Sequence, residues 1–230
     1  MAALTTPTVI DLAHDSVRDL NRVLHQAGPG TSWRIEHPDG AHNVAVGLTE
    51  DLDVVIGGPV GYYGAGMNQR ATVTIHGNAG TGVAENMMSG TVRVRGSASQ
   101  SAGATAHGGL LVIDGDASAR CGISMKGVDI VVGGNVGHMS AFMGQAGRLV
   151  VCGDAGDALG DSLYEARIYV KGKVKSLGAD CVEKEMRAEH LAELAELLKA
   201  AERDDAPADF RRYGSARNLY HFKVDNSTSY

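Results

Sequence analysis

Hydrophobic and polar positions alternate in one short phrase that returns every nineteen residues along most of the chain. Each copy ends in a glycine, and the side chains two and four positions before it are always aliphatic, as Leu111 and Ile113 are before Gly115. Such alternation is typical of a β-strand with one buried face. The phrase therefore predicts a strand before each of seven glycines: Gly58, Gly77, Gly96, Gly115, Gly134, Gly153 and Gly172.

The residues that follow each glycine predict a corner in the chain. The next position is Asn, Asp or Ser in five of the seven copies, and these residues hydrogen-bond their own backbone in turns. The position after that is always Val or Ala, which suits a side chain that points back inside. Glycine permits the positive φ that tight corners need. We therefore expect the seven glycines to be structural corners with positive φ.

A strict period of this length indicates a solenoid. Nineteen residues are too few for a helical repeat but suit one coil of a parallel β-helix. The sequence thus predicts a mainly β fold, a right-handed parallel β-helix of about seven 19-residue coils with helical flanks. A β-helical acyltransferase is not favoured, because its six-residue repeat fails here: steps of six from Ile75 meet Thr81, Met87 and Arg93.

The flanks follow other patterns. Residues 15–27 predict a helix with Asp15 or Ser16 as the N-cap, and residues 33–48 predict a hairpin around Pro38. Residues 183–205 predict a second amphipathic helix, and we expect both helices to cap the ends of the solenoid, where strand edges need cover.

These patterns divide the chain into three parts. They are an N-terminal helix and hairpin cap (residues 1–51), the β-helix (52–182), and a C-terminal helix with an aromatic and basic docking tail (183–230). The tail is rich in aromatic residues, which solvated tails rarely are, so it should lie either on its own rod or on a partner.

Composition narrows the functional classes. The net charge of −6 argues against nucleic acid as the main partner. No run of eighteen apolar residues occurs and the N-terminus does not resemble a signal peptide, so we expect a soluble, cytoplasmic protein without a membrane partner. Three cysteines, Cys121, Cys152 and Cys181, occupy different places in the repeat and are interpreted as reduced bystanders rather than metal ligands.

Candidate catalytic residues do not form a pattern. His76 is expected to face outward on a strand, and His107 and His138 fall at different places in the repeat without a neighbouring acid. A general base assembled across coils stays open, but the sequence predicts no catalytic residue and no metal site. The methionines late in the coils either fill the interior or form an adaptable partner surface.

Several glycine-rich stretches carry a resemblance to a known family. They are GYYGAGMNQ (61–69), TVTIHGNAG (72–80), GVAENMMSGTVRV (82–94) and GDALGDSLYEA (156–166). The chain resembles the GXGXG β-helix domain at the C-terminus of the glutamate synthase large subunit. It resembles still more the stand-alone GXGXG subunits of N-methylglutamate synthases, also called methylamine–glutamate N-methyltransferases. The resemblance runs over essentially the whole chain.

The resemblance implies a division of labour among three chains. An amidotransferase-like chain handles the amine, and a glutamate synthase-like chain binds FMN and an iron–sulfur cluster. This chain would then be a non-catalytic scaffold or channel subunit that binds no cofactor, within a hetero-oligomer that makes N-methylglutamate from methylamine and L-glutamate. Two alternatives stay open: a C-type subunit of a formyltransferase/hydrolase complex like formylmethanofuran dehydrogenase, or a purely structural β-solenoid.

A scaffold needs a surface for its partners. Aromatic residues and arginine dominate protein–protein hot spots, and methionine adapts to varied surfaces. The residues that we expect to contact a partner or line a channel are Asn68, Asn86, Met87, Met88, His107, Phe210, Arg211, Arg212, Tyr213 and Tyr220.

Overall fold

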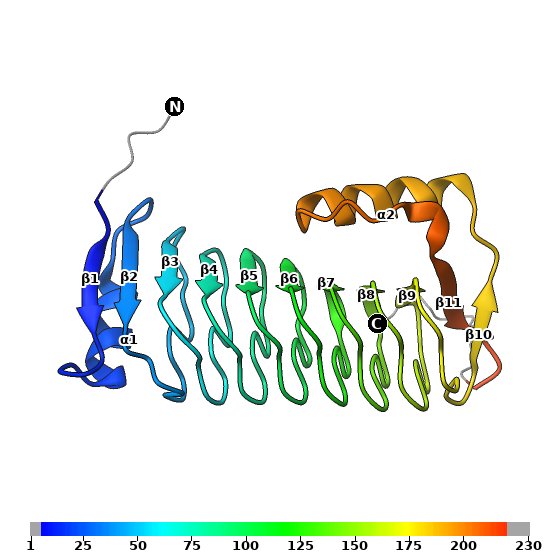
Figure 1. The fold of residues 1–230 in the computed structure, drawn as a ribbon, viewed down its shortest axis with the longest axis horizontal. Helices are drawn as coiled ribbons and strands as arrows, with labels where there is room; N and C mark the ends of the chain where they lie inside the picture. The colour runs from blue at the N-terminus through cyan, green and yellow to red at the C-terminus, as the bar shows by residue number, and fades with distance from the viewer. Residues whose placement is uncertain (1–5, 220–230) are drawn as a thin grey trace, which may run out of the picture.

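The protein is a rod of stacked coils, seen here in a computed structural model that describes residues 6–219 (Figure 1). It is mainly β, with eleven strands in one sheet of order β1-β2-β3-β4-β5-β6-β7-β8-β9-β11-β10 among the described residues. The predicted β-solenoid of about seven repeated coils is confirmed. The strands are β1 (Thr8–Asp11), β2 (Ser32–Glu36), β3 (Asp53–Ile56), β4 (Thr72–Ile75), β5 (Thr91–Val94), β6 (Leu110–Ile113), β7 (Lys126–Val132), β8 (Ala146–Val151), β9 (Arg167–Val170), β10 (Cys181–Lys184) and β11 (Arg211–Ser215).

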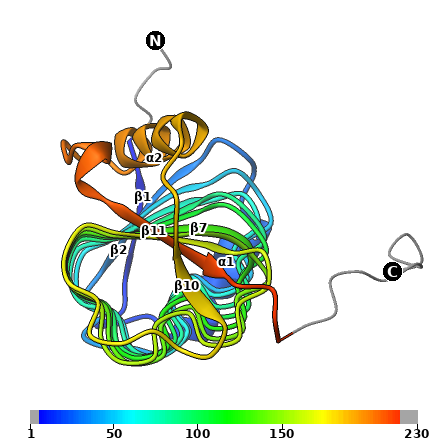
Figure 2. The ribbon, with the colours of Figure 1, turned by 90° about the vertical axis from the view of Figure 1, so that its right-hand side faces the viewer.

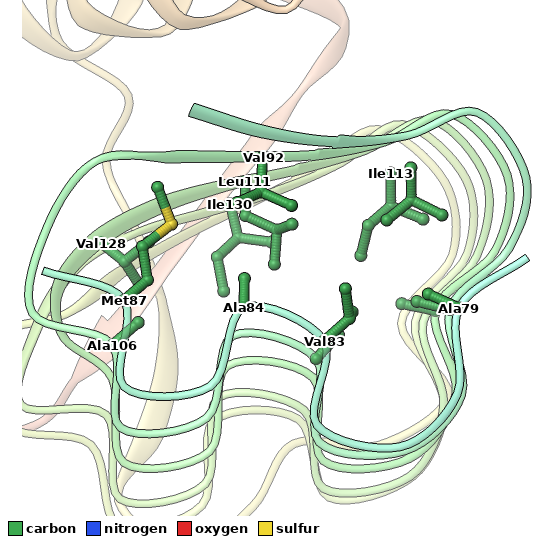
Figure 3. Close-up of a cluster of buried hydrophobic side chains, with 14 of the residues drawn as sticks. Ala79, Val83, Ala84, Met87, Val92, Ala106, Leu111, Ile113, Val128 and Ile130 are labelled. Carbon is green, nitrogen blue, oxygen red and sulfur yellow. The ribbon is translucent and has the colours of Figure 1, made fainter. Parts of the chain in front are cut away.

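The strands β1 to β9 pair in parallel, each with the next along the chain. From β3 onward the partners are nineteen residues apart, so that Val92 pairs with Leu111 and Leu111 with Ile130. All fourteen aliphatic positions two and four before the glycines are fully buried, which confirms the predicted ladders. Figure 3 shows Val92, Leu111 and Ile130 stacked on the inner side of the strands.

The seven corner glycines are needed for close approach and not for positive φ. Only Gly77 has a positive φ, at 158°, which is close to extended backbone, so the prediction of positive φ at these corners was wrong. A Cβ placed on Gly115 would lie 2.6 Å from Ser97 Oγ and 2.9 Å from the carbonyl oxygen of Gly96. The coils stack so closely at this corner that a side chain has no room.

The polar residues after these glycines connect one coil to the next instead of bonding their own turn. The backbone N–H of Ser97 donates to Asn78 Oδ1 at 2.9 Å, and that of Asp154 donates to Asn135 Oδ1 at 2.8 Å. Equivalent bonds join the other coils from residue 78 to residue 173. The Val or Ala that follows each polar residue faces inward, as predicted, and is buried in all but the last coil.

Positive φ occurs elsewhere, in the segment of each coil that leads from the corner back to the next strand. We call this segment the meander; in the coil of β3 it covers residues 61–71. Three positions with positive φ recur every nineteen residues, for example Tyr63 (58°), Ala65 (52°) and Met67 (55°). In later coils a glycine before the strand, such as Gly90 (81°), adds a fourth. Figure 3 shows the meander opposite the strands, with Val83, Ala84 and Met87 pointing into the rod.

The predicted hairpin at residues 33–48 is absent. Only one strand, β2, forms there, and it pairs in parallel with β1 on one side and β3 on the other. The following residues form a meander with positive φ at Asn43, Ala45 and Gly47, as in the later coils. The stretch predicts a hairpin because Pro38-Asp39-Gly40 is typical of a turn between antiparallel strands. In the structure these residues form the corner of an additional coil.

The helix α1 (Val17–Gln26) covers the N-terminal end of the rod. Ser16 is its N-cap, as one of the two expected residues, and its hydroxyl accepts from the backbone N–H of Asp19. Leu20 and Leu24 are buried in the same hydrophobic core as the first coils. The predicted N-terminal helical cap is therefore present.

The helix α2 (Ala188–Ala200) lies along the rod instead of capping its end (Figure 1). Its residues Leu194, Leu197 and Leu198 pack on the outer face of the sheet, over a row of outward side chains from β6 to β9. That row consists of Val112, Val131, Val150 and Tyr169, whereas the same column in β4 and β5 holds Thr74 and Arg93. Beneath α2 the outward column is apolar and buried, whereas Thr74 and Arg93 in the two preceding strands are polar.

The C-terminal end is closed by two strands. After α2 and a short 3-10 helix (Pro207–Asp209), β11 pairs antiparallel with β9, and β10 pairs antiparallel with β11. Viewed along the rod, both strands cross the near end of the coils (Figure 2). Tyr213 is 2% exposed within the main core and Phe210 packs beneath α2, so the first part of the expected docking tail belongs to the rod itself.

Candidate partner-binding surface

Two of the residues expected to contact a partner are inside the rod. Met87 is fully buried in the core. Asn68 is also fully buried, and its amide bonds the backbone: Nδ2 donates to the carbonyl of Ala71 at 2.8 Å, and Oδ1 accepts from the Ala71 N–H at 3.2 Å. Both expectations were wrong, since these side chains fill and brace the interior of the meander.

Asn86, Met88 and His107 do lie on the surface, close together. Asn86 Oδ1 accepts a hydrogen bond from Thr105 Oγ1 of the next coil at 2.7 Å. Met88 and His107 occupy equivalent positions in successive coils, and the His107 N–H donates to the Met87 carbonyl at 2.7 Å. The structure therefore brings these three residues together on one side of the rod.

The stacking of coils turns this side into two continuous columns, which we call the meander face. Every member of one column is exposed, and the other column, which contains Asn86, is exposed or half-buried. Between them lies a column in which every residue is buried, the one that holds Asn68 and Met87. The fully exposed column is Gln69, Met88, His107, Lys126, Gln145 and Tyr164. The second column is Met67, Asn86, Thr105, Ser124, Met143 and Ser162.

Large apolar side chains are unusually exposed on and beside this face. Met67 is 52% exposed, Met88 49% and Met143 44%, and Tyr164 lies in the same columns at 40%. Tyr62 begins the same meander as Met67 and is 53% exposed; its ring stacks on His42, with 4.4 Å between ring centroids and an interplanar angle of 3°. Flexible methionines and aromatic rings are side chains that protein-binding surfaces favour.

On the opposite, strand side of the rod, α2 covers the outer face of β6 to β9. There α2 is held by apolar contacts and by rows of charged groups on its flanks. Glu193 of α2 accepts from Tyr169 and from Arg167, the latter at 2.6 Å. Burial pushes the pKa of Glu193 upward, but these hydrogen bonds outweigh it and hold that pKa below its usual value. At the other end, Arg93 pairs with Glu202 at 2.9 Å.

The remaining predicted contact residues lie at the C-terminal end. Phe210 and Tyr213 are buried, so the expectation that they meet a partner was wrong. Arg211 is exposed, while Arg212 is half-buried and donates from Nε to the carbonyl of Glu185 at 3.0 Å. Tyr220 lies outside the described residues.

Candidate nucleophiles on the rod are of low reactivity. Cys121, Cys152 and Cys181 are free thiols, and burial raises the pKa of each to about 12. A thiol with such a pKa stays protonated near neutral pH and is a poor nucleophile. Over residues 6–219, no cluster of three or more His, Cys, Asp or Glu side chains is arranged to hold a metal ion. Within the same range neither helix is long and apolar enough to cross a membrane.

The chain is similar over nearly its full length to a known protein. It is 63% identical over 226 residues to the protein GlxC of Rhizobium meliloti (strain 1021), and the match covers 96% of this chain and 99% of that protein. No family model matches the chain.

Proposed function

The chain belongs to the GlxC family, and we propose that it is a non-catalytic scaffold subunit of a glutamate synthase-like complex. The proposed complex converts methylamine and L-glutamate to N-methylglutamate and ammonia. The proposal rests on the resemblance of the glycine-rich coils to the GXGXG subunits of N-methylglutamate synthases, and on the surface of the rod.

One observation carries the scaffold role: the contrast between the two sides of each coil. The strand side is covered by α2 over β6 to β9, whereas the meander face exposes Met67, Met88 and Met143 along the rod. Met67 and Met88 lie in successive coils, and so do Met143 and Tyr164 farther along the rod. Exposed apolar side chains that gather on one face mark interaction sites. A partner that binds the meander face would bury them.

The proposed partners are an amidotransferase-like chain and an FMN-binding glutamate synthase-like chain that also holds an iron–sulfur cluster. These chains supply the chemistry, and this chain binds no cofactor of its own. Its contribution is geometric: parallel coils joined by backbone hydrogen bonds make a rigid spacer that fixes the distance between two sites. Ammonia or methylamine would pass between those sites inside the assembly.

Exposed residues of the meander face provide the test. In Met88→Glu and Met143→Glu, a charge replaces an apolar contact at the proposed interface, while the free rod keeps its fold because both side chains are exposed. We expect each variant to weaken assembly by roughly thirtyfold or more, the scale of an interface hot spot. Co-purification of the tagged chain from its native cells, followed by identification of the bound chains, measures this.

A matched control uses an exposed apolar residue elsewhere. Val9 on β1 is 57% exposed at the N-terminal end, far from the meander face of the central coils. Val9→Glu should co-purify the same partners as the parent. The scaffold role fails if the parent is monomeric in native extracts. If partners bind but Met88→Glu and Val9→Glu behave alike, the meander face is not the interface.

A further inference from the structure

A cavity of about 380 Å³ lies at the C-terminal end of the rod, where β10 and β11 meet the N-terminus of α2. Its walls carry far more positive than negative charge, although the whole chain has a net charge of −6. The residues that line it are Tyr164, Glu165, Ala166, Arg167, Lys184, Arg187, His190, Arg212, Gly214, Ser215 and Arg217.

Two of these cations face each other without a compensating carboxylate. Lys184 of β10 and Arg212 of β11 are directly opposite in the antiparallel pair, so their side chains are on the same face of the sheet. Like charges in this position are destabilising. Among the described residues neither side chain forms an ion pair, and Arg212 has only the bond from Nε to the Glu185 carbonyl.

The acidic residues nearby are bound to other cations. Glu165, the carboxylate that lines the cavity, pairs with Arg217 at 3.1 Å. Glu193 pairs with Arg167 at 2.6 Å, and Glu185 pairs with Arg187 at 3.0 Å. The cavity therefore keeps a positive charge from Lys184 and Arg212 that no described carboxylate offsets.

The first turn of α2 adds to this charge. A helix N-terminus carries a partial positive charge and unsatisfied N–H groups, which usually meet an acceptor at the N-cap. Here the N-cap is Arg187, whose guanidinium has donors only. Glu185 at 3.0 Å and Glu189 at 4.0 Å offset the charge of Arg187, so the first turn contributes the partial positive charge of its N–H groups.

His190 supplies a directed donor to the same cavity. It is 9% exposed, and its Nδ1 accepts from the backbone N–H of Arg187 at 3.2 Å, which places the ring proton of the neutral form on Nε2. Burial, and then the charge of Arg212, lower its pKa, so the ring is neutral at physiological pH. No hydrogen bond within the described chain uses Nε2–H.

We propose that this cavity binds a small oxyanion with two negative charges, a phosphate group or a dicarboxylate, held by Lys184, Arg212 and His190. The anion would relieve the repulsion between the two cations and accept from the histidine and from the first turn of α2. The site goes beyond the scaffold role, since it is formed by this chain alone.

The test is a calorimetric titration of the full chain with inorganic phosphate, with succinate and with acetate, at one ionic strength set with sodium chloride. We expect phosphate, succinate or both to bind, with acetate weaker by at least about tenfold. Binding of phosphate alone identifies a phosphorylated ligand, and binding of succinate alone identifies a dicarboxylate.

Two variants and a control locate the site. Lys184→Gln and Arg212→Gln should each weaken binding by about tenfold or more, and Lys199→Gln, which removes an exposed cation from the other end of α2, should leave it unchanged. Without ligand, Lys184→Gln should melt no lower than the parent, because it removes a like-charge pair.

Two results would overturn the proposal. The first is that neither phosphate nor succinate binds the full chain more tightly than chloride does. The second is that Lys184→Gln and Arg212→Gln bind as tightly as the parent.

Discussion

The two sides of each coil are built from the same nineteen-residue repeat but obey different rules. On the strand side, side chains alternate in and out with a period of two, and the inward ones are all aliphatic and fully buried. On the meander side every second residue over part of the segment has positive φ. Sequence neighbours there have opposite environments: Met87 is buried and Met88 is 49% exposed. Both sides supply side chains to the core, and the meander side also supplies an exposed surface.

The difference shows how a solenoid can hold a stable fold and a variable surface at once. The strands need aliphatic residues at fixed positions, because each inward side chain contacts its equivalents in the coils above and below. The fully exposed column of the meander faces solvent and contributes nothing to the core, so it tolerates Gln, Met, His, Lys and Tyr at one position. Binding specificity can change there without a cost to the core.

The largest expected effect is a charge in the strand-side core. Ile113→Asp places a carboxylate between aliphatic side chains of neighbouring coils, and we expect it to lower the free energy of unfolding by about 3–5 kcal/mol. Thr74→Asp is the control, because Thr74 points outward on β4 and lies opposite Arg93. Chemical denaturation of both variants measures the difference, and equal midpoints would mean that the assigned strand register is wrong.

The second effect concerns the corners that join the two sides. Gly115→Ala would place a Cβ 2.6 Å from Ser97 Oγ and 2.9 Å from the Gly96 carbonyl, so we expect a loss of about 1–3 kcal/mol from overpacking. Gly28→Ala has open space and no positive φ, and should keep or slightly raise the melting temperature. Gly115→Ala with the stability of the parent would show that the coils are not in close contact there.

Much of the strand side could be predicted from the sequence. The alternation of aliphatic and other residues predicts strands with one buried face, and the nineteen-residue repeat predicts that equivalent strands stack in parallel. The sequence also contains a signal for the position of α2 that the prediction did not use. The outward side chains change from Thr74 and Arg93 to Val112 and Val131 at the strands that the helix covers. The seven glycines are corners, as predicted, but the reason is close stacking of the coils and not positive φ. Glycine alone does not distinguish the two, because both conditions favour it.

The meander could not be predicted in the same way. Its positive φ angles fall on Ala, Met, Ser and Thr as well as on glycine, so no residue type marks them. The nineteen-residue repeat nevertheless shows which meander positions are buried and which are exposed. The column of Met87 continues as Ala106 and Met125, whereas that of Met88 continues as His107 and Lys126, which separates the buried from the exposed column.

A smaller effect of opposite sign is expected in the meander. Ser124 has a φ of 52°, a conformation that costs a non-glycine residue about 1 kcal/mol or more, so Ser124→Gly should raise the free energy of unfolding by about 0.5–1 kcal/mol. Ser118→Gly, at a position without positive φ, should lower it. Thermal unfolding of Ser124→Gly and Ser118→Gly measures both changes. If the two variants changed the free energy of unfolding in the same direction, the meander would not be strained at Ser124.

The smallest effect is expected at the exposed rim of the first coils, where His37 Nδ1 lies 2.7 Å from Asp11 Oδ1. Asp11 raises the pKa of His37 above 6.5, while the Ala13 N–H and then His37 lower the pKa of Asp11 below 3.8. The contribution of His37 is therefore complete below pH 6.5 and is lost as pH rises through its raised pKa. That of Asp11 is complete above pH 3.8 and is lost as pH falls through its lowered pKa.

Both side chains are exposed, so the contact between Asp11 and His37 should change the pKa of His37 but hardly change the free energy of unfolding. In Asp11→Asn we expect the pKa of His37 to fall back toward 6.5 and the midpoint of chemical denaturation to stay unchanged. NMR of the ring protons of His37 measures its pKa. A His37 that titrates identically with and without Asp11 would show that this contact does not persist in solution.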